Sequence, residues 1–170
     1  MILGLTPFTF FHVVISLAGI LSGLVVAYGL LTSKRLDGWT IVFLVTTVAT
    51  NVTGFLFPFH GFTPAIGVGI ISTIVLIAAI AARYSFHMTG LWRWVYVGGA
   101  VIALYFNVFV LIVQSFQKIP ALHELAPTQS EPPFVIAQGL ALVLFVALGI
   151  FALRRFHPPV DVVGAIGIAR

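Results

Sequence analysis

The 170-residue sequence contains no cysteine. Without a thiol, the chain can form no disulfide framework, no thiolate metal site and no iron–sulfur cluster, and it has no cysteine nucleophile. The motifs Gly-x-Ser-x-Gly and His-Glu-x-x-His, which mark many hydrolases and metalloproteases, are also missing. The sequence therefore identifies no catalytic residue and favours a non-enzymatic role.

Charged residues are almost as scarce. They make up 7% of the chain, against 61% hydrophobic residues, and the mean hydropathy is +1.18. A soluble globular domain carries about 25% charged residues, so this composition is that of a protein whose partner is the lipid bilayer. The net charge of +4 comes from a few basic residues scattered between apolar runs, which excludes a nucleic-acid-binding patch.

Long uncharged stretches define the predicted membrane spans. Residues 38–82 contain no Asp, Glu, Lys or Arg, and one helix of that length would measure about 67 Å, roughly twice the apolar thickness of a bilayer. The stretch must therefore fold back, and Pro58 and Pro64 mark the turn. We predict an all-α, five-helix transmembrane bundle within residues 1–156, with spans at about 8–31, 40–56, 65–82, 91–113 and 133–153, and a short tail at 157–170.

The distribution of Lys and Arg predicts the orientation of the bundle. Lys118 is the one cation at one end of the spans, whereas the other end collects Lys34, Arg35, Arg83, Arg93, Arg154, Arg155 and Arg170. Because cytoplasmic loops are enriched in Lys and Arg, the N-terminus is expected outside and the C-terminus in the cytoplasm, in a bacterial inner membrane. A group of basic and aromatic residues at the cytoplasmic end is expected to anchor lipid headgroups: Arg83, His87, Trp92, Arg93 and Trp94.

The first span carries a stripe of small residues. Gly19 and Gly23 form a Gly-x-x-x-Gly pair, which lets another helix backbone approach closely in lipid. We expect this stripe to be a contact within the bundle. The alternative is a homo-oligomer that forms through the same two glycines.

Most polar residues of the spans lie in their outer halves. Unsatisfied amides in hydrocarbon cost several kcal/mol, so these groups must hydrogen-bond one another, water or a ligand. One interpretation is that they join neighbouring helices. The other is an outward-facing polar chamber that binds a ligand, formed by His12, Asn51, His60, Asn107, Gln114 and Gln138.

Three kinds of cofactor fit such a chamber. A divalent metal would use His12, His60, His123 and Glu124 as nitrogen and oxygen ligands, although no pair has the His-x-x-x-His spacing. A haem b would need facing axial ligands, and His12 is the one histidine inside a predicted span. A quinone would use Asn, Gln and His hydrogen bonds among phenylalanine side chains.

Transport is the competing class of function. Proton- and ion-coupled carriers place ionisable residues inside their spans or interrupt those spans with Gly and Pro. Here no acidic or basic residue lies in the middle of a predicted span, since Arg93 is close to the cytoplasmic end of its own, and the nine prolines lie outside the helix interiors. The sequence favours a binding or accessory subunit, with a larger membrane complex as a candidate partner; the alternative is a small redox protein holding haem b or quinone near the outer face.

Overall fold

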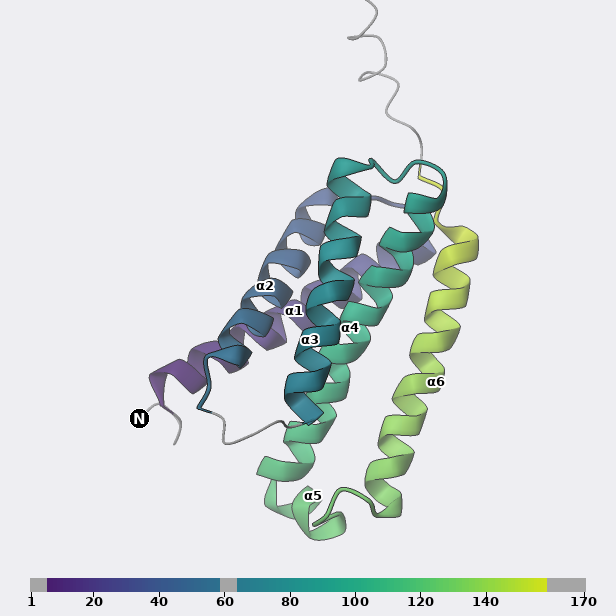
Figure 1. Cartoon of the computed structure of the whole chain (residues 1–170). Coiled ribbons are helices and arrows are strands. Elements are labelled where there is room, and N and C mark those ends of the chain that lie inside the picture. Colours follow the sequence, from purple (N-terminus) through teal and green to yellow (C-terminus); the bar gives the residue numbers. More distant parts are fainter. Residues whose placement is uncertain (1–5, 59–63, 159–170) are drawn as a thin grey trace, which may run out of the picture.

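The structure is a computed structural model that describes residues 6–58 and 64–158, and all the regular structure in these residues is helical (Figure 1). The helices are α1 (Pro7–Leu31), α2 (Asp37–Phe55), α3 (Pro64–Ile80), η1 (Ala81–Ser85), α4 (Leu91–Lys118), α5 (Pro120–Leu125) and α6 (Pro132–Arg155). The α3 helix runs directly into η1, a single π-helical turn that the sequence did not predict.

Five of these helical segments are long and apolar enough to cross a membrane: α1, α2, α3 with η1, α4 and α6. Each of the five predicted spans overlaps one of them. The α4 helix continues to Lys118, beyond the predicted end at residue 113, because no proline interrupts it before Pro120. A residue that precedes proline avoids the helical conformation, and Ile119 is accordingly extended.

Prolines and hydroxyl groups also fix where helices begin. Pro7 occupies the first turn of α1, where a missing N–H costs nothing, and the Thr6 side chain accepts a hydrogen bond from the Thr9 N–H at 3.2 Å. Pro120 and Pro132 begin α5 and α6 in the same way. The short helix α5 lies in the long loop between α4 and α6, where the sequence places prolines on both sides of a polar segment.

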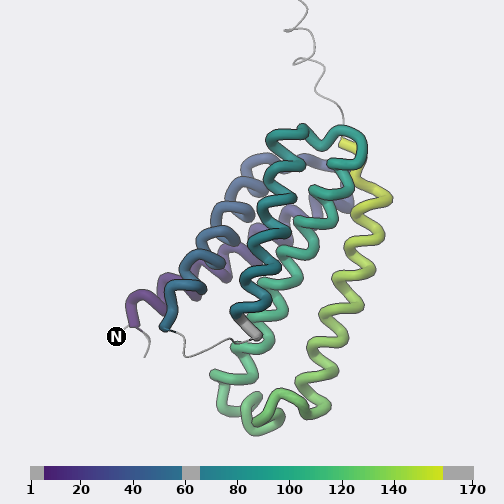
Figure 2. Tube along the Cα trace, in the orientation of Figure 1, coloured from purple at the N-terminus to yellow at the C-terminus, as the bar shows by residue number. Residues whose placement is uncertain are grey.

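The helices α2, α3 and α4 lie side by side, and α1 crosses behind them obliquely (Figures 1 and 2). The α6 helix packs on the outer side of α4 and also touches α1. One end of the bundle carries η1 and the turn before α4, and the other carries α5. We call these the η1 end and the α5 end.

The best-buried side chains lie toward the η1 end. Phe43 of α2, Tyr96 and Leu104 of α4, and Phe156 after α6 are each at most 1% exposed. By contrast, α6 buries few of its own residues, and Ala141 and Ala152 are the two that are buried. The outer surface of α6 is apolar, as expected for a helix facing lipid.

Gly19 and Gly23 pack within this one chain. A methyl group added at Gly23 would lie 2.5 Å from Leu104 Cδ1 and 2.9 Å from the Phe43 ring, and one at Gly19 would lie 3.3 Å from Thr46 Oγ1. The two glycines thus let α1 approach α2 and α4. A second copy of the chain could reach them only by displacing these side chains.

Candidate functional site

His12 pairs α1 with α2. Its Nδ1 lies 2.7 Å from Thr53 Oγ1, and its ring meets Phe57 edge to face, with centroids 5.1 Å apart. The Thr53 hydroxyl donates to the Ala49 carbonyl at 2.7 Å, so it is an acceptor for an N–H on His12 Nδ1. His12 is only partly buried, and its nearest polar partner is a threonine of the neighbouring helix.

Asn51 joins α2 to α3. Its Nδ2 donates to Ser72 Oγ at 3.1 Å and to Thr73 Oγ1 at 3.2 Å. Ser72 is 2% exposed, so this contact is shielded from the surroundings of the bundle. Ser72 was not predicted as part of the site, because an isolated serine in an apolar helix has no distinctive spacing.

Asn107 joins α4 to α2 at a point close to Gly19 of α1. It is 8% exposed and its Nδ2 donates to Thr47 Oγ1 at 3.2 Å. Thr47 is fully buried, and the absence of a side chain at Gly19 makes room for both groups. Close backbone approach and an interhelical hydrogen bond therefore occur at one point of the bundle.

Gln138 joins α6 to α4, and its amide is satisfied on one side only. Its Nε2 donates to the Phe109 carbonyl at 3.2 Å. Its Oε1 is buried, and no donor among the described residues reaches it. The opposite assignment of the Gln138 amide nitrogen and oxygen is unfavourable, because it would place the side-chain oxygen against the Phe109 carbonyl oxygen, and both atoms are acceptors.

The structure does not gather the expected chamber into one polar site. His12, Asn51, Asn107 and Gln138 take part in four separate helix contacts. Gln114 is exposed on α4. His60 lies outside the described residues.

The candidate metal ligands are likewise dispersed. His123 and Glu124 are exposed on α5, away from His12 on the first turns of α1. Within residues 6–58 and 64–158 no three His, Asp or Glu side chains are close enough to hold a metal ion. The hydrogen-bond and ring partners of His12 are Thr53 and Phe57, whereas His87 and His157 lie at the η1 end and His123 is exposed on α5, so the described residues do not bring two histidines together as axial haem ligands.

Arg83 requires a correction. It was predicted to be a lipid anchor, but its side chain is buried, with the residue only 3% exposed at the η1 end of the bundle. Its Nη2 forms an ion pair with Asp37 Oδ1, and its guanidinium lies 4.8 Å from the centre of the Tyr96 ring. The carboxylate of Asp37 at the start of α2 gives the buried guanidinium a partner of opposite charge. Asp37 was not predicted to be a partner of Arg83. The one feature of the sequence that could have indicated its role is its position in the first turn of a long helix.

Arg93 has a second role besides any contact with lipid. Its Nη1 donates to the carbonyls of Leu153 and Phe156, which are acceptors left unpaired at the end of α6. Trp94, which lies beneath the Arg93 guanidinium, is 48% exposed. Trp92 stacks on Phe86 with ring centroids 3.8 Å apart.

His87, the remaining expected lipid anchor, is exposed in the turn that follows η1. An exposed histidine beside the aromatic pair suits the boundary between lipid and water. Of the five expected anchors, the structure thus removes Arg83 from the surface and gives Arg93 an additional partner within the chain.

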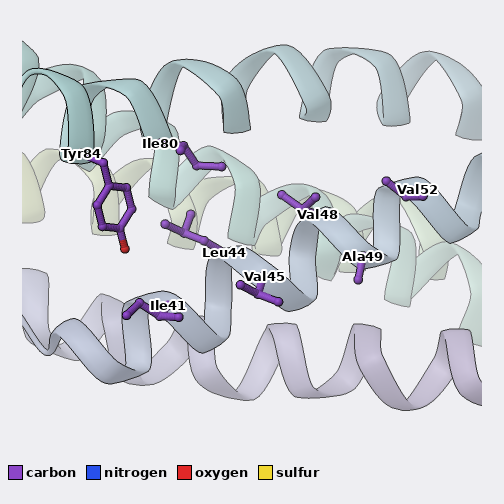
Figure 3. A pocket seen from close by; sticks show the side chains of 8 residues that line it. All are labelled: Ile41, Leu44, Val45, Val48, Ala49, Val52, Ile80 and Tyr84. Atoms are coloured by element: carbon purple, nitrogen blue, oxygen red, sulfur yellow. The ribbon is translucent and has the colours of Figure 1, made fainter.

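Two apolar grooves open on the surface of the bundle. The larger has a volume of about 620 Å³ and lies between α2 and the continuous α3–η1 segment (Figure 3). The other, of about 410 Å³, lies between α4 and α6. Figure 3 shows Tyr84 at one end of the larger groove, with Val52 near the other.

Both grooves are apolar, so they suit the side chains of another helix or the chains of lipids more than a polar substrate. Comparison of the chain with protein-family models, with curated proteins and with solved structures finds no significant match.

Proposed function

We propose that this chain is an integral membrane protein, with its N-terminus outside and its C-terminus in the cytoplasm of a bacterium, that acts as a non-enzymatic accessory subunit. In this proposal, the groove between α2 and α3 binds a transmembrane helix of a partner protein. The observation that carries the proposal is a stripe of stiff apolar side chains along that groove.

The membrane location is supported by five long apolar helices. The orientation is supported by the unequal distribution of Lys and Arg between the two ends of the bundle. Lys34, Arg35, Arg83 and Arg93 are at the η1 end, as are Arg154 and Arg155, whereas Lys118 is at the α5 end. The bias counts basic residues in short loops and beside span ends, whether or not their side chains touch lipid, so the burial of Arg83 does not weaken it.

The stripe consists of four residues of α2. Ile41, Val45, Val48 and Val52 follow one another at spacings of four, three and four, and are 51%, 61%, 37% and 53% exposed. This is the spacing at which side chains of one helix fit between those of another. β-Branched side chains are held in few rotamers, so they lose little entropy when a second helix covers them.

The walls of the groove complete a surface shaped for a helix. Ala49 is the smallest lining side chain, and Ile80 and Tyr84 form the opposite wall on α3 and η1. Because lipid is as apolar as a leucine side chain, shape complementarity of this kind is what favours a protein helix over lipid.

The redox alternative has less support. The His12 Nδ1 pairs with Thr53, and the other described histidines lie at the η1 end or on α5, so no pair of axial haem ligands is assembled among the described residues. The accessory role instead uses a surface that is open in the structure.

The experiment compares purified variants of the full chain from its native membranes in a mild detergent. The wild type is expected to elute with one other membrane polypeptide in a fixed ratio, and Val45→Trp with Val48→Trp is expected to lose it. Leu21→Trp is the matched control, because Leu21 is 65% exposed on α1 and lies outside the groove. A photoreactive residue at Val48 should form its adduct on an apolar segment of that same polypeptide.

Four results would overturn the proposal, and the first three concern what elutes with the chain. The wild type elutes alone, the partner still elutes with the variant that carries both tryptophan substitutions, or a second copy of this chain occupies the groove. In the last case the complex has twice the mass of the chain, and the adduct maps to its own sequence. Adducts with lipid alone would place an acyl chain in the groove and would also reject a partner helix.

A further inference from the structure

We propose that the groove between α4 and α6 binds a long-chain amphiphile whose head group donates a hydrogen bond, such as a hydroxyl, to Gln138 Oε1. The proposal rests on the membrane location argued above and is independent of any partner at the α2–α3 groove. It concerns the opposite side of the molecule and a different kind of ligand.

Gln138 has an acceptor atom without a hydrogen-bond partner. Gln138 Nε2 is fixed on the Phe109 carbonyl, and the buried Oε1 finds no donor among the described residues. A buried amide oxygen without a partner is energetically unfavourable, so a ligand that donates a hydrogen bond to it gains affinity by removing that cost.

The Gln138 side chain lies near one end of the groove between α4 and α6. Leu142, one turn after Gln138 on α6, lines the groove, as does Phe106, three residues before Phe109 on α4. The amide therefore lies just beyond the groove, toward the α5 end. Tyr105 and Phe145 face each other across the same region with ring centroids 5.6 Å apart.

The groove has space for the hydrocarbon chain of a ligand. The groove has a volume of about 410 Å³ and continues toward the η1 end to Ile150 and Leu153. Gly98 forms part of its wall, and a methyl group added there would meet nothing within 4 Å. A volume in this range accommodates a small-molecule ligand, and apolar walls open to the bilayer favour a hydrocarbon chain.

These features specify the head group. The acceptor lies next to a groove that is lined by aromatic and aliphatic side chains, so the site favours a neutral donor. A charged head group would have to be desolvated beside Phe106 and Leu142 with no counter-ion among the groove-lining residues. A fatty or isoprenoid alcohol has the matching chemistry.

The test uses 1-hexadecanol and its methyl ether as probes, which share a chain and differ in the donor. Each is added at an equal mole fraction to the full chain in the same detergent, and the bound fraction is measured by native mass spectrometry. The wild type should retain the alcohol about fivefold more than the ether, the value of one ordinary hydrogen bond. Equal retention in the wild type would overturn the proposal without any variant.

Three variants locate the site. Gln138→Leu should abolish the preference for the alcohol and leave ether binding intact. Gly98→Leu should weaken binding of both probes because its side chain enters the groove, and neither backbone nor side chains obstruct its Cβ. Gly139→Leu is the matched control, since Gly139 also has open space around an added Cβ but does not line the groove.

A preference for the alcohol that survives Gln138→Leu would place the donor elsewhere and overturn the proposal. Equal loss of binding in Gly98→Leu and Gly139→Leu would reject the groove as the site. Val45→Trp with Val48→Trp should leave both probes unaffected, so failure of the proposed partner site and failure of this site give different results.

Discussion

Arg83 and Asp37 are 46 residues apart in the sequence, and their side chains form an ion pair that ties η1 to the first turn of α2. The Arg83 side chain is 2% exposed, whereas that of Asp37 is 63% exposed. The pair therefore places a buried guanidinium against a carboxylate at the edge of the bundle. Asp37 also favours its own helix, because a negative charge in the first turn interacts well with the helix dipole.

We expect Asp37→Ala to lower the free energy of unfolding in detergent by about 1–3 kcal/mol, because it leaves the buried guanidinium without its carboxylate. Glu124→Ala, which removes an exposed acid from α5, should change the thermal midpoint little. In Arg83→Met with Asp37→Ala, the loss should be smaller than the sum of the single losses. Additive losses would show that the two side chains do not depend on each other.

The Gly23 contact gives a prediction about packing. A methyl group at this position would collide with Leu104 and Phe43, which are each 1% exposed, so these side chains would have to shift within the packed core. Gly23→Ala should therefore destabilise the bundle by about 1–3 kcal/mol. Gly98→Ala, which meets open space, should be neutral or stabilising because alanine favours a helix. Thermal unfolding of the two variants tests the pair, and an equal effect would contradict the contact.

Orientation in the membrane is tested by labelling in intact cells. Ser130 and Thr89 are both exposed and lie at opposite ends of the bundle, before α6 and before α4. A cysteine at Ser130 should react with a thiol reagent that does not cross membranes, and one at Thr89 should react only after the cells are opened. The wild-type chain has no cysteine, so it is its own blank. Reversed labelling would invert the orientation.

Glu131 gives a prediction about pH. Partial desolvation by itself raises the pKa of its carboxyl, but hydrogen bonds from the Glu131 and Thr128 backbone, the Thr128 hydroxyl and the Ser130 N–H outweigh it, so the pKa lies below its ordinary value. Because the folded pKa is the lower one, the stabilisation is complete above the ordinary glutamate pKa and is lost as pH falls through the folded value.

We expect protection of the Thr128 amide from hydrogen exchange, corrected for the intrinsic pH dependence, to be constant near neutral pH and to fall on acidification. In Glu131→Gln the profile should be flat, because the amide does not titrate in this range. A fall of the same size in both proteins would assign it to another group.

The sequence by itself determined the number of long helices and their approximate limits. An uncharged run such as residues 38–82 is too long for one crossing, and Pro58 and Pro64 restrict where it turns, so both facts depend on local chemistry alone. The extension of α4 to Lys118 was missed because polar residues near a span end can continue a helix, and hydropathy does not detect this.

Only the tertiary structure decided the partners of the polar side chains. Depth along a span placed His12, Asn51 and Asn107 near one another, but a hydrogen bond also depends on how each helix is rotated and which helices are neighbours. The resulting contacts are separate pairs, such as Asn107 with Thr47 and Asn51 with Ser72, because each of these asparagines meets a hydroxyl group on the helix beside it. The burial of Arg83 follows from the same cause, since its carboxylate partner lies on a different helix.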